Sequence, residues 1–252
     1  MSKIVVIGGT GLIGSKVVAK LTEHGHEAIA ASPNSGVNTL TGEGLAEVLA
    51  GADTVLDVSN SPSFADDDVM AFFTTATTNI IDAAKAAGVG HYVALSVVGA
   101  ELMVDSGYQR AKVAQEKLIK TSGIPYSIVH ATQFFEFVKS IAAAGTEGET
   151  VRIAPVLFQP IAADDVAAAV GRTAVGTPLN GTLDIAGPQR SRFDEFIRDA
   201  LASINDPRTV VSDPHAPYFG AEITERSLVP GDGAVLGEIT FADWLKTNRP
   251  GQ

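Results

Sequence analysis

Tyr108 and Lys112 are the two residues in this chain whose types and spacing best fit acid–base chemistry. They are four positions apart, so on a helix their side chains share one face. A free tyrosine has a pKa of about 10, and a neighbouring ammonium favours the phenolate and lowers that pKa. The pair predicts a general acid for a carbonyl that receives hydride, or a general base in the reverse direction. A solvated helix face is the alternative interpretation.

A glycine array, G-x-x-G-x-x-G, follows the apolar run of residues 4–7 and precedes a helical pattern. At such a position the first glycine permits a tight turn, and the second lets backbone N–H groups approach a pyrophosphate. The third lets the helix pack on the strand, and the positive end of the helix faces the phosphates. The array therefore predicts a dinucleotide site. The loop residues that we expect to bind the cofactor are Gly8, Thr10, Gly11, Leu12, Ile13 and Gly14.

The end of the second predicted strand bears on which dinucleotide is bound. An acidic residue there would hold the ribose diol of NAD, but Ser32 and Asn34 stand there, with neither a carboxylate nor an arginine nearby. Because nothing repels a 2′-phosphate and both side chains could donate to it, the sequence favours NADP(H) over NAD(H). After the third strand, Ser59 and Asn60 are expected to border the adenine, with an ordinary turn as the alternative.

Short apolar runs alternate with longer amphipathic stretches, which predicts βαβ units on a parallel sheet. The fold class is therefore α/β, a Rossmann-like doubly wound parallel sheet. Strands are expected at residues 4–7, 27–31, 54–58, 92–96, 126–130 and 182–185, and helices at residues 67–87, 108–121, 163–173 and 193–203.

The amino-acid composition of the chain changes at about residue 205, where prolines and glycines interrupt any long helix or strand. The remaining stretch still carries large apolar residues such as Tyr218, Phe219 and Trp244, so it is too apolar for a disordered linker. We expect an NAD(P)-binding domain at residues 1–203 and a small C-terminal substrate lobe at residues 204–252, packed on it as one structural unit.

The glycine loop, the strand ending in Ser96 and the segment from Tyr108 to Lys112 resemble the short-chain dehydrogenase/reductase superfamily. Residues 124–134 and 161–167 look like the atypical, NmrA-like branch of that superfamily. The resemblance covers residues 1–203. It implies a Rossmann-like NAD(P)-binding fold, although the branch also contains members that bind the dinucleotide without catalysis.

The resemblance also implies roles for individual residues. Tyr108 would be the proton donor, Lys112 would bind the nicotinamide ribose and tune the tyrosine, and Ser96 would help to hold the carbonyl oxygen. The residues implied to border the nicotinamide and the substrate are Thr132, Gln133 and Phe134. His130, at the end of a strand near this site, is a candidate substrate contact, with a satisfied, partly buried histidine as the alternative.

The sequence departs from the pattern of many relatives at two points. Val97 stands where they have a second, active serine, so Ser96 is expected to point to the other face of its strand. No residue matches the asparagine of the proton relay, and Asn79 is expected to be a structural residue of the long helix.

Composition limits the classes of partner. The 252 residues include 18 Lys and Arg against 29 Asp and Glu, a net charge of −11, and no cysteine. Phosphate contacts need clustered cations, so we expect no nucleic acid and no membrane partner. No apolar run approaches the ~18 residues that span a bilayer, and no secretory signal or metal-ligand spacing is found. A cytoplasmic protein is expected, with its oligomeric state, including a homo-oligomer, left open.

The function predicted on these grounds is an NAD(P)H-dependent oxidoreductase acting on a carbonyl or quinone of a small apolar or aromatic substrate. A non-catalytic, NmrA-like regulator that senses the dinucleotide and binds a protein partner is the alternative. An epimerase or dehydratase that holds its cofactor tightly is a third hypothesis.

Overall fold

The central feature of the protein, described here for residues 1–248 from a computed structural model, is a seven-stranded sheet. Its strand order is β12-β9-β5-β4-β3-β1-β2, and β1 pairs in parallel with both β2 and β3. β3 pairs in parallel with β4, and β9 with β12. The predicted doubly wound α/β fold is confirmed. The strands of this sheet are β1 (Lys3–Ile7), β2 (Glu27–Ala31), β3 (Thr54–Asp57), β4 (His91–Val97), β5 (Tyr126–Ala131), β9 (Gly181–Ala186) and β12 (Val235–Leu236).

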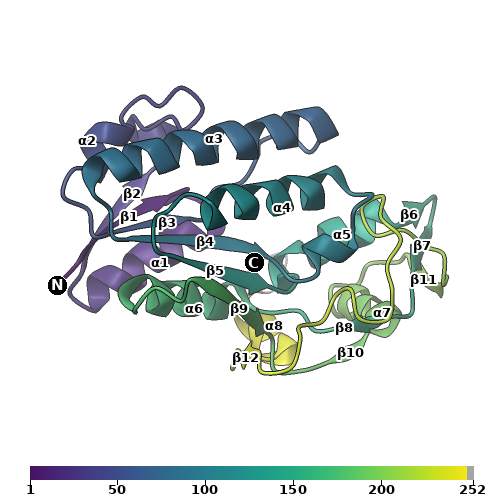
Figure 1. Ribbon diagram of the computed structural model, residues 1–252. Helices are drawn as coiled ribbons and strands as arrows, with labels where there is room; N and C mark the ends of the chain where they lie inside the picture. Colours follow the sequence, from purple (N-terminus) through teal and green to yellow (C-terminus); the bar gives the residue numbers. More distant parts are fainter. Residues whose placement is uncertain (249–252) are drawn as a thin grey trace. The chain divides into compact units, whose positions relative to one another are not determined.

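Helices cover both faces of the strands β1 to β5. Figure 1 shows α2, α3 and α4 on one face, and α1 and α6 on the other. This two-sided cover explains why the residues of β1 form a continuous apolar run, in which Ile4, Val5 and Val6 are fully buried. The helices are α1 (Leu12–Glu23), α2 (Leu45–Leu49), α3 (Asp66–Ala87), α4 (Gly107–Lys120), α5 (Val138–Ala144), α6 (Ala163–Val175), α7 (Phe193–Ser203) and α8 (Phe241–Thr247).

The chain forms two compact units. The first comprises residues 1–96, 107–130 and 166–183, and the second comprises residues 97–106, 131–165 and 184–252. The division therefore does not follow the expected boundary at residue 203, because the chain passes between the units several times. A change of composition along the chain is visible in the sequence, but the composition does not indicate which distant segments pack together.

The second unit contains short strands that the sequence analysis did not anticipate. In one small sheet, β7 pairs in parallel with β11 and antiparallel with β6, and in the other β8 pairs antiparallel with β10. A core of its own, which includes Phe158, Phe193 and Leu228, holds these elements together. The additional strands are β6 (Thr146–Glu147), β7 (Thr150–Ile153), β8 (Leu157–Phe158), β10 (Ser191–Arg192) and β11 (Thr209–Ser212).

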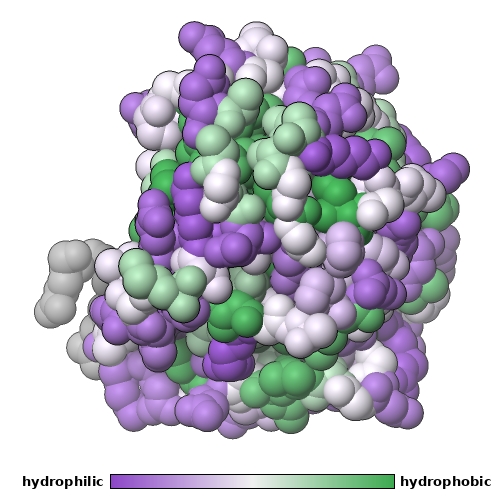
Figure 2. All heavy atoms as spheres, turned by 60° about the vertical axis from the view of Figure 1, so that its left-hand side comes forward, coloured by the Kyte–Doolittle hydropathy of each residue, from purple (hydrophilic) through white to green (hydrophobic). Residues whose placement is uncertain are grey.

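Hydrophilic and hydrophobic side chains are both visible on the face of the protein drawn in Figure 2. On the face drawn in Figure 2, hydrophilic residues surround smaller groups of hydrophobic ones. Such isolated apolar groups are normal on a folded chain. One exposed aromatic residue, Phe64, packs on the ring of Tyr108. Across residues 1–248, none of the helices has the length and apolar character needed to cross a membrane.

Candidate cofactor and active site

The glycine loop turns so tightly between β1 and α1 that Gly8 and Gly14 have no room for a side chain. Gly8 has a φ of +78°, and a Cβ there would lie 2.8 Å from Ser59 Cα. A Cβ on Gly14 would lie 2.2 Å from the Gly8 carbonyl oxygen, so the start of α1 packs directly on the loop. Helix α1 follows the N-cap residue Gly11 and has no acidic residue in its first turn. Its first N–H groups, which lack partners within a helix, are therefore free of a side-chain cap and suited to an anion.

Two of the other predicted cofactor residues lie after β2. Ser32 is buried, and within residues 1–248 its Oγ has no hydrogen-bond partner. The Ser32 N–H donates to Ser35 Oγ at 2.9 Å, which fixes the turn, and Asn34 is exposed in that turn. A buried hydroxyl without a partner is costly, so a ligand oxygen at this place would satisfy it. The residues present thus fit a dinucleotide.

Asp57, the last residue of β3, fixes the loop that follows it. Its Oδ1 accepts hydrogen bonds from the Ser59 N–H at 3.0 Å and from the Ser59 hydroxyl at 2.6 Å. Ser59 is therefore held beside Gly8, while the neighbouring Asn60 is exposed. These positions agree with the expected location of the pair at the end of the third strand. Whether they border an adenine stays a prediction.

Tyr108 begins α4 within an aromatic cluster rather than beside a cation. Its ring lies 5.8 Å from that of Phe64 and 5.9 Å from that of Phe73, edge to face with the latter. Burial raises the pKa of Tyr108 to about 12. The expected lowering of this pKa is thus wrong, because desolvation disfavours the phenolate.

Lys112 is almost fully buried and directs its ammonium towards the strands. Nζ donates to the Leu95 carbonyl oxygen at 2.9 Å and to Gln115 Oε1, and it lies 4.4 Å from the centre of the Phe73 ring. Burial lowers the pKa of Lys112 to about 8, although the carboxylates of Asp57 and Glu116 act to raise it. A lysine in this state titrates near neutral pH, which is typical of functional sites.

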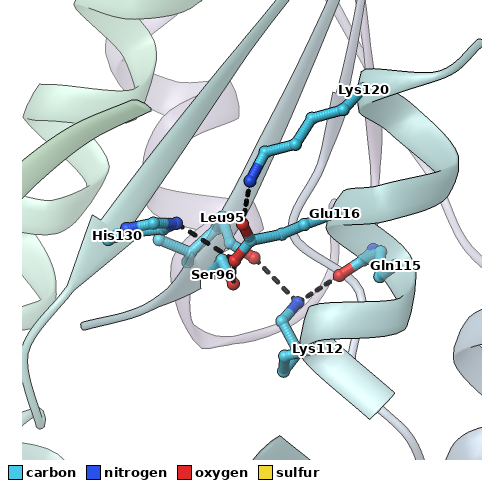
Figure 3. Close-up of polar contacts among 7 residues, drawn as sticks. All are labelled: Leu95, Ser96, Lys112, Gln115, Glu116, Lys120 and His130. Atoms are coloured by element: carbon cyan, nitrogen blue, oxygen red, sulfur yellow. Dashed lines mark hydrogen bonds and ion pairs between the residues drawn. The ribbon is translucent and has the colours of Figure 1, made fainter. Parts of the chain in front are cut away.

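Ser96 belongs to a second group of polar contacts, drawn in Figure 3. The Ser96 hydroxyl donates to Glu116 Oε1 at 2.7 Å, and His130 Nε2 lies 3.0 Å from the same oxygen. Lys120 Nζ donates to Glu116 Oε2 at 2.8 Å. Burial acts to raise the pKa of Glu116, but the hydrogen bonds from His130, Lys120 and Ser96 hold it at about 2. The Ser96 proton is therefore committed to Glu116, and its role towards a substrate carbonyl stays a prediction.

The remaining predicted site residues lie in the second unit, except for His130. The Thr132 hydroxyl donates to the Gln159 carbonyl oxygen at 2.6 Å, and the Phe134 ring stacks on Phe137. Gln133 is buried, and neither polar atom of its side chain has a partner in the part of the chain that the structure describes. Its predicted contact with substrate stays open, as does that of His130.

Four polar residues of this region are not among the site residues predicted from the sequence, namely Asp57, Tyr92, Gln115 and Glu116. All four are buried. Gln115 and Glu116 follow Lys112 by three and four positions, so helical spacing alone placed them near it. Asp57 ends an otherwise apolar strand, and a buried carboxylate of this kind requires partners. By contrast, Asn79 donates to the carbonyl oxygens of Thr39 and Leu40, which confirms its structural role.

The likeness of this chain to proteins of known structure extends over the whole fold. It aligns with UDP-N-acetylglucosamine 4-epimerase from Bacillus cereus at a TM-score of 0.72 and 18% identity, covering 100% of this chain and 98% of the other. It aligns with the NADPH-dependent quinone oxidoreductase QOR2 of Escherichia coli, complexed with NADPH, at a TM-score of 0.65 and 21% identity, covering 83% and 77%. At these identities the likeness shows the fold.

Sequence comparison gives a more specific result. The chain is 26% identical over 147 residues to the photosystem II assembly factor Ycf39 of Cyanophora paradoxa, an alignment that covers 53% of this chain and 46% of that protein. The chain thus spans about half the length of this relative. A family model described as NAD(P)H-binding matches residues 8–173, which is more than half of the chain and includes the glycine loop, Tyr108 and Lys112. The chain therefore belongs to the NAD(P)H-binding family, which confirms the recognised likeness to the short-chain dehydrogenase/reductase superfamily.

Proposed function

We propose that this protein is an NADPH-dependent reductase of the atypical, NmrA-like type, which reduces a carbonyl or quinone group of a small apolar or aromatic substrate. One observation carries the proposal: a single compact unit contains both the glycine loop, followed by a helix without a side-chain cap, and the pair Tyr108 and Lys112 on one helix. The loop suits a pyrophosphate, and the helix supplies an acid and a cation.

The protonation state of Tyr108 supports the direction of reduction. With a pKa of about 12, the phenol keeps its proton throughout the neutral range. It can therefore donate that proton to an oxygen that gains negative charge as hydride arrives. When bound, the dinucleotide would supply the hydride. Lys112 would add positive charge beside the ribose and the tyrosine. Ser96, whose hydroxyl donates to Glu116, is not given a part in this proposal.

The choice of NADPH rests on Ser32. Its buried, unpartnered hydroxyl lies at the end of β2, where a carboxylate would favour NAD instead. Asn34, exposed in the following turn, adds a second donor. The quinone reductase of similar fold is complexed with NADPH, and its substrate class is consistent with an apolar substrate for this chain.

A non-catalytic role is the second candidate, and two observations favour it. The Ser96 proton is committed to Glu116, and the sequence relative Ycf39 is named as an assembly factor rather than as a reductase. In this version the protein would bind the dinucleotide and a protein partner without turnover. An epimerase, as in the Bacillus cereus structure, would show no net consumption of NADPH.

Turnover by the wild type and two tyrosine variants tests the proposal. NADPH oxidation is followed by absorbance against a panel of quinones and aromatic ketones. We expect Tyr108→Phe to lose at least ~100-fold in kcat, the scale of general acid catalysis, while it still binds NADPH. Tyr126→Phe, at the start of β5, is the matched control and should retain wild-type kcat. Tight binding of NADPH without turnover of any compound would contradict the reductase proposal and favour the non-catalytic sensor.

A further inference from the structure

Two buried, oppositely charged side chains in the first unit are joined by a single amide. Lys112 Nζ donates to Gln115 Oε1, and Gln115 Nε2 donates to Asp57 Oδ2 at 2.9 Å. The exposed fractions of Asp57, Lys112 and Gln115 are 2%, 3% and 1%. We call this arrangement the amide bridge. Figure 3 shows its first half, with Lys112 and Gln115 on α4 and the Leu95 carbonyl oxygen on β4.

The orientation of the bridging amide is set by the two charges. An ammonium can only donate and a carboxylate can only accept, so the residue between them must present an acceptor to one and a donor to the other. Gln115 does both. A glutamate at this position would place a carboxylate against Asp57, and a methionine would leave two buried charges without their shared partner.

The same carboxylate reaches the cofactor loop with its other oxygen. Asp57 Oδ1 holds the N–H and the hydroxyl of Ser59, and the Ser59 backbone abuts Gly8, where no side chain would fit. Tyr92 donates to Oδ2 at 3.1 Å, so the two oxygens of this carboxylate bond the loop on one side and the interior of the fold on the other. A continuous chain of hydrogen bonds thus leads from Ser59, whose backbone lies against Gly8, through Asp57 and Gln115, to Lys112.

We propose that Asp57 and Gln115 are positioning residues for the reaction: they fix the Lys112 ammonium and the Ser59 loop as one unit, so that cofactor binding at the loop and the placement of the lysine depend on each other. This inference rests on the proposed function, in which Lys112 lies at the nicotinamide ribose. A purely structural role is the competing explanation, because buried and paired charges also hold a fold together.

Two substitutions should move the titration of Lys112 in opposite directions. Asp57→Asn removes a negative charge and should lower the pKa of Lys112 by about one unit, whereas Gln115→Glu adds one and should raise it by a similar amount. The other titratable groups around the ammonium are Tyr92 and Glu116, with His130 and Lys120 behind Glu116, and both substitutions leave them in place. NMR of isotope-labelled but chemically unmodified lysine side chains, with Lys112→Arg to assign the signal, measures this pKa.

The full experiment adds the affinity for NADPH, the pH dependence of kcat/KM and urea unfolding. We expect Asp57→Asn and Gln115→Met to weaken NADPH binding about tenfold or more, and we expect the alkaline limb of Asp57→Asn to move to lower pH with the lysine. Thr54→Val is the matched control. It removes a buried hydrogen bond, from Thr54 Oγ1 to the Ala174 carbonyl oxygen, at the opposite end of the same strand. Thr54→Val should lower the free energy of unfolding but leave the NADPH affinity and the pKa of Lys112 unchanged.

The outcomes separate the two proposals. If the wild type binds NADPH but turns nothing over, the reductase fails, while the lysine titrations and binding constants still test the amide bridge. Wild-type titration of Lys112 and wild-type NADPH affinity in folded Asp57→Asn, Gln115→Glu and Gln115→Met would overturn the bridge. If Asp57→Asn does not fold, the titration of Lys112 in Gln115→Glu and the NADPH affinity of Gln115→Met decide in the same way whether the amide bridge positions the lysine.

Discussion

The Ser96 hydroxyl donates its proton to Glu116 Oε1 across 2.7 Å, from the end of β4 to the middle of α4. Glu116 also accepts from Lys120, and His130 lies within hydrogen-bond distance, so the carboxylate is held from three sides. Ser96 lies next to Val97, where many relatives have the active serine. The contact directs Ser96 towards α4, the helix that also carries Tyr108 and Lys112, and the expected orientation of Ser96 away from the carbonyl stays a prediction.

The first prediction concerns Ser96 itself. Ser96→Ala removes one donor to Glu116 and should lower the free energy of unfolding by about 1 kcal/mol. Because its proton is committed to Glu116, we expect kcat to fall less than ~10-fold, far less than in Tyr108→Phe. Steady-state kinetics and urea unfolding of both variants check this. A loss of kcat in Ser96→Ala as large as that in Tyr108→Phe would contradict this prediction and assign Ser96 to the substrate carbonyl.

The second prediction is a loss of stability in acid that depends on Glu116. Its pKa is about 2 in the folded protein against the ordinary value of 4.5, so the native state binds the proton less readily than the unfolded chain. The stabilisation is therefore complete above pH 4.5 and is lost as the pH falls towards 2. Urea unfolding over this window should show a steeper decline for the wild type than for Glu116→Gln. Parallel curves would contradict it.

His91 predicts a second window at higher pH. Burial lowers its pKa from 6.5 to about 4, so the unfolded chain takes up a proton before the native state does. The contribution of neutral His91 is thus present above pH 6.5 and is lost as the pH falls towards 4. In His91→Asn, whose amide can still bond Ser127, unfolding free energies measured across this window should lose that slope. An unchanged slope would assign it to another group.

The aromatic cluster predicts how Tyr108 can be tuned. Phe64 is 67% exposed, yet its ring covers one side of Tyr108. Phe64→Ala should admit water to the phenol and lower the pKa of Tyr108 from about 12 towards 10.0, with little change in stability. Ultraviolet titration, as a difference against Tyr108→Phe, measures this pKa. Phe137→Ala, an exposed phenylalanine of the second unit, is the control and should leave it unchanged.

The glycine loop predicts a sharp contrast between two alanine substitutions. Gly14→Ala would push a Cβ to 2.2 Å from the Gly8 oxygen, so we expect it to lower stability by about 3 kcal/mol or more and to abolish NADPH binding. Gly25→Ala is the control. That glycine has a φ of +80° with open space around it, so its cost is about 1 kcal/mol and binding should persist. Normal NADPH affinity in Gly14→Ala would remove the loop from the site.

The elements that position the site were predictable because their signals are local. The strand at residues 27–31 and the helix at residues 193–203 lie where periodicity places them, and α3 and α4 differ from the prediction only at their ends. The position of the glycine loop between strand and helix was equally clear. Short strands such as β8 and β10 were missed, since two residues carry no period and their pairing joins distant parts of the chain.

The polar interior was harder to predict because its contacts are tertiary. Helical spacing placed Lys112 on the face of Tyr108, but not the direction of its ammonium, which turns to Leu95 and Gln115. The sign of the Tyr108 pKa shift was wrong for the same reason, since the surrounding phenylalanines come from α3 and the loop before it. The partners of Asp57 become known only once the fold brings Gln115 of α4 to the end of β3.

The choice of cofactor is predicted to rest on one side chain. Ser32→Asp would place a carboxylate at the end of β2, where it repels a 2′-phosphate and can bond a ribose diol. We expect NADPH affinity to fall about tenfold or more and NADH affinity to rise. Ser140→Asp, which adds the same charge on an exposed position of α5, should change neither. An unaltered ratio of the two affinities in Ser32→Asp would take this residue out of the cofactor site.

Calorimetric titration of the wild-type protein with NADPH and, in parallel, with NADH tests the central claim most directly. The loop after β1, the uncapped start of α1 and the buried Ser32 hydroxyl predict one saturable site that binds NADPH more tightly than NADH. Binding of neither nucleotide, by a protein shown to be folded, would contradict the cofactor site and the chemistry built on Tyr108 and Lys112.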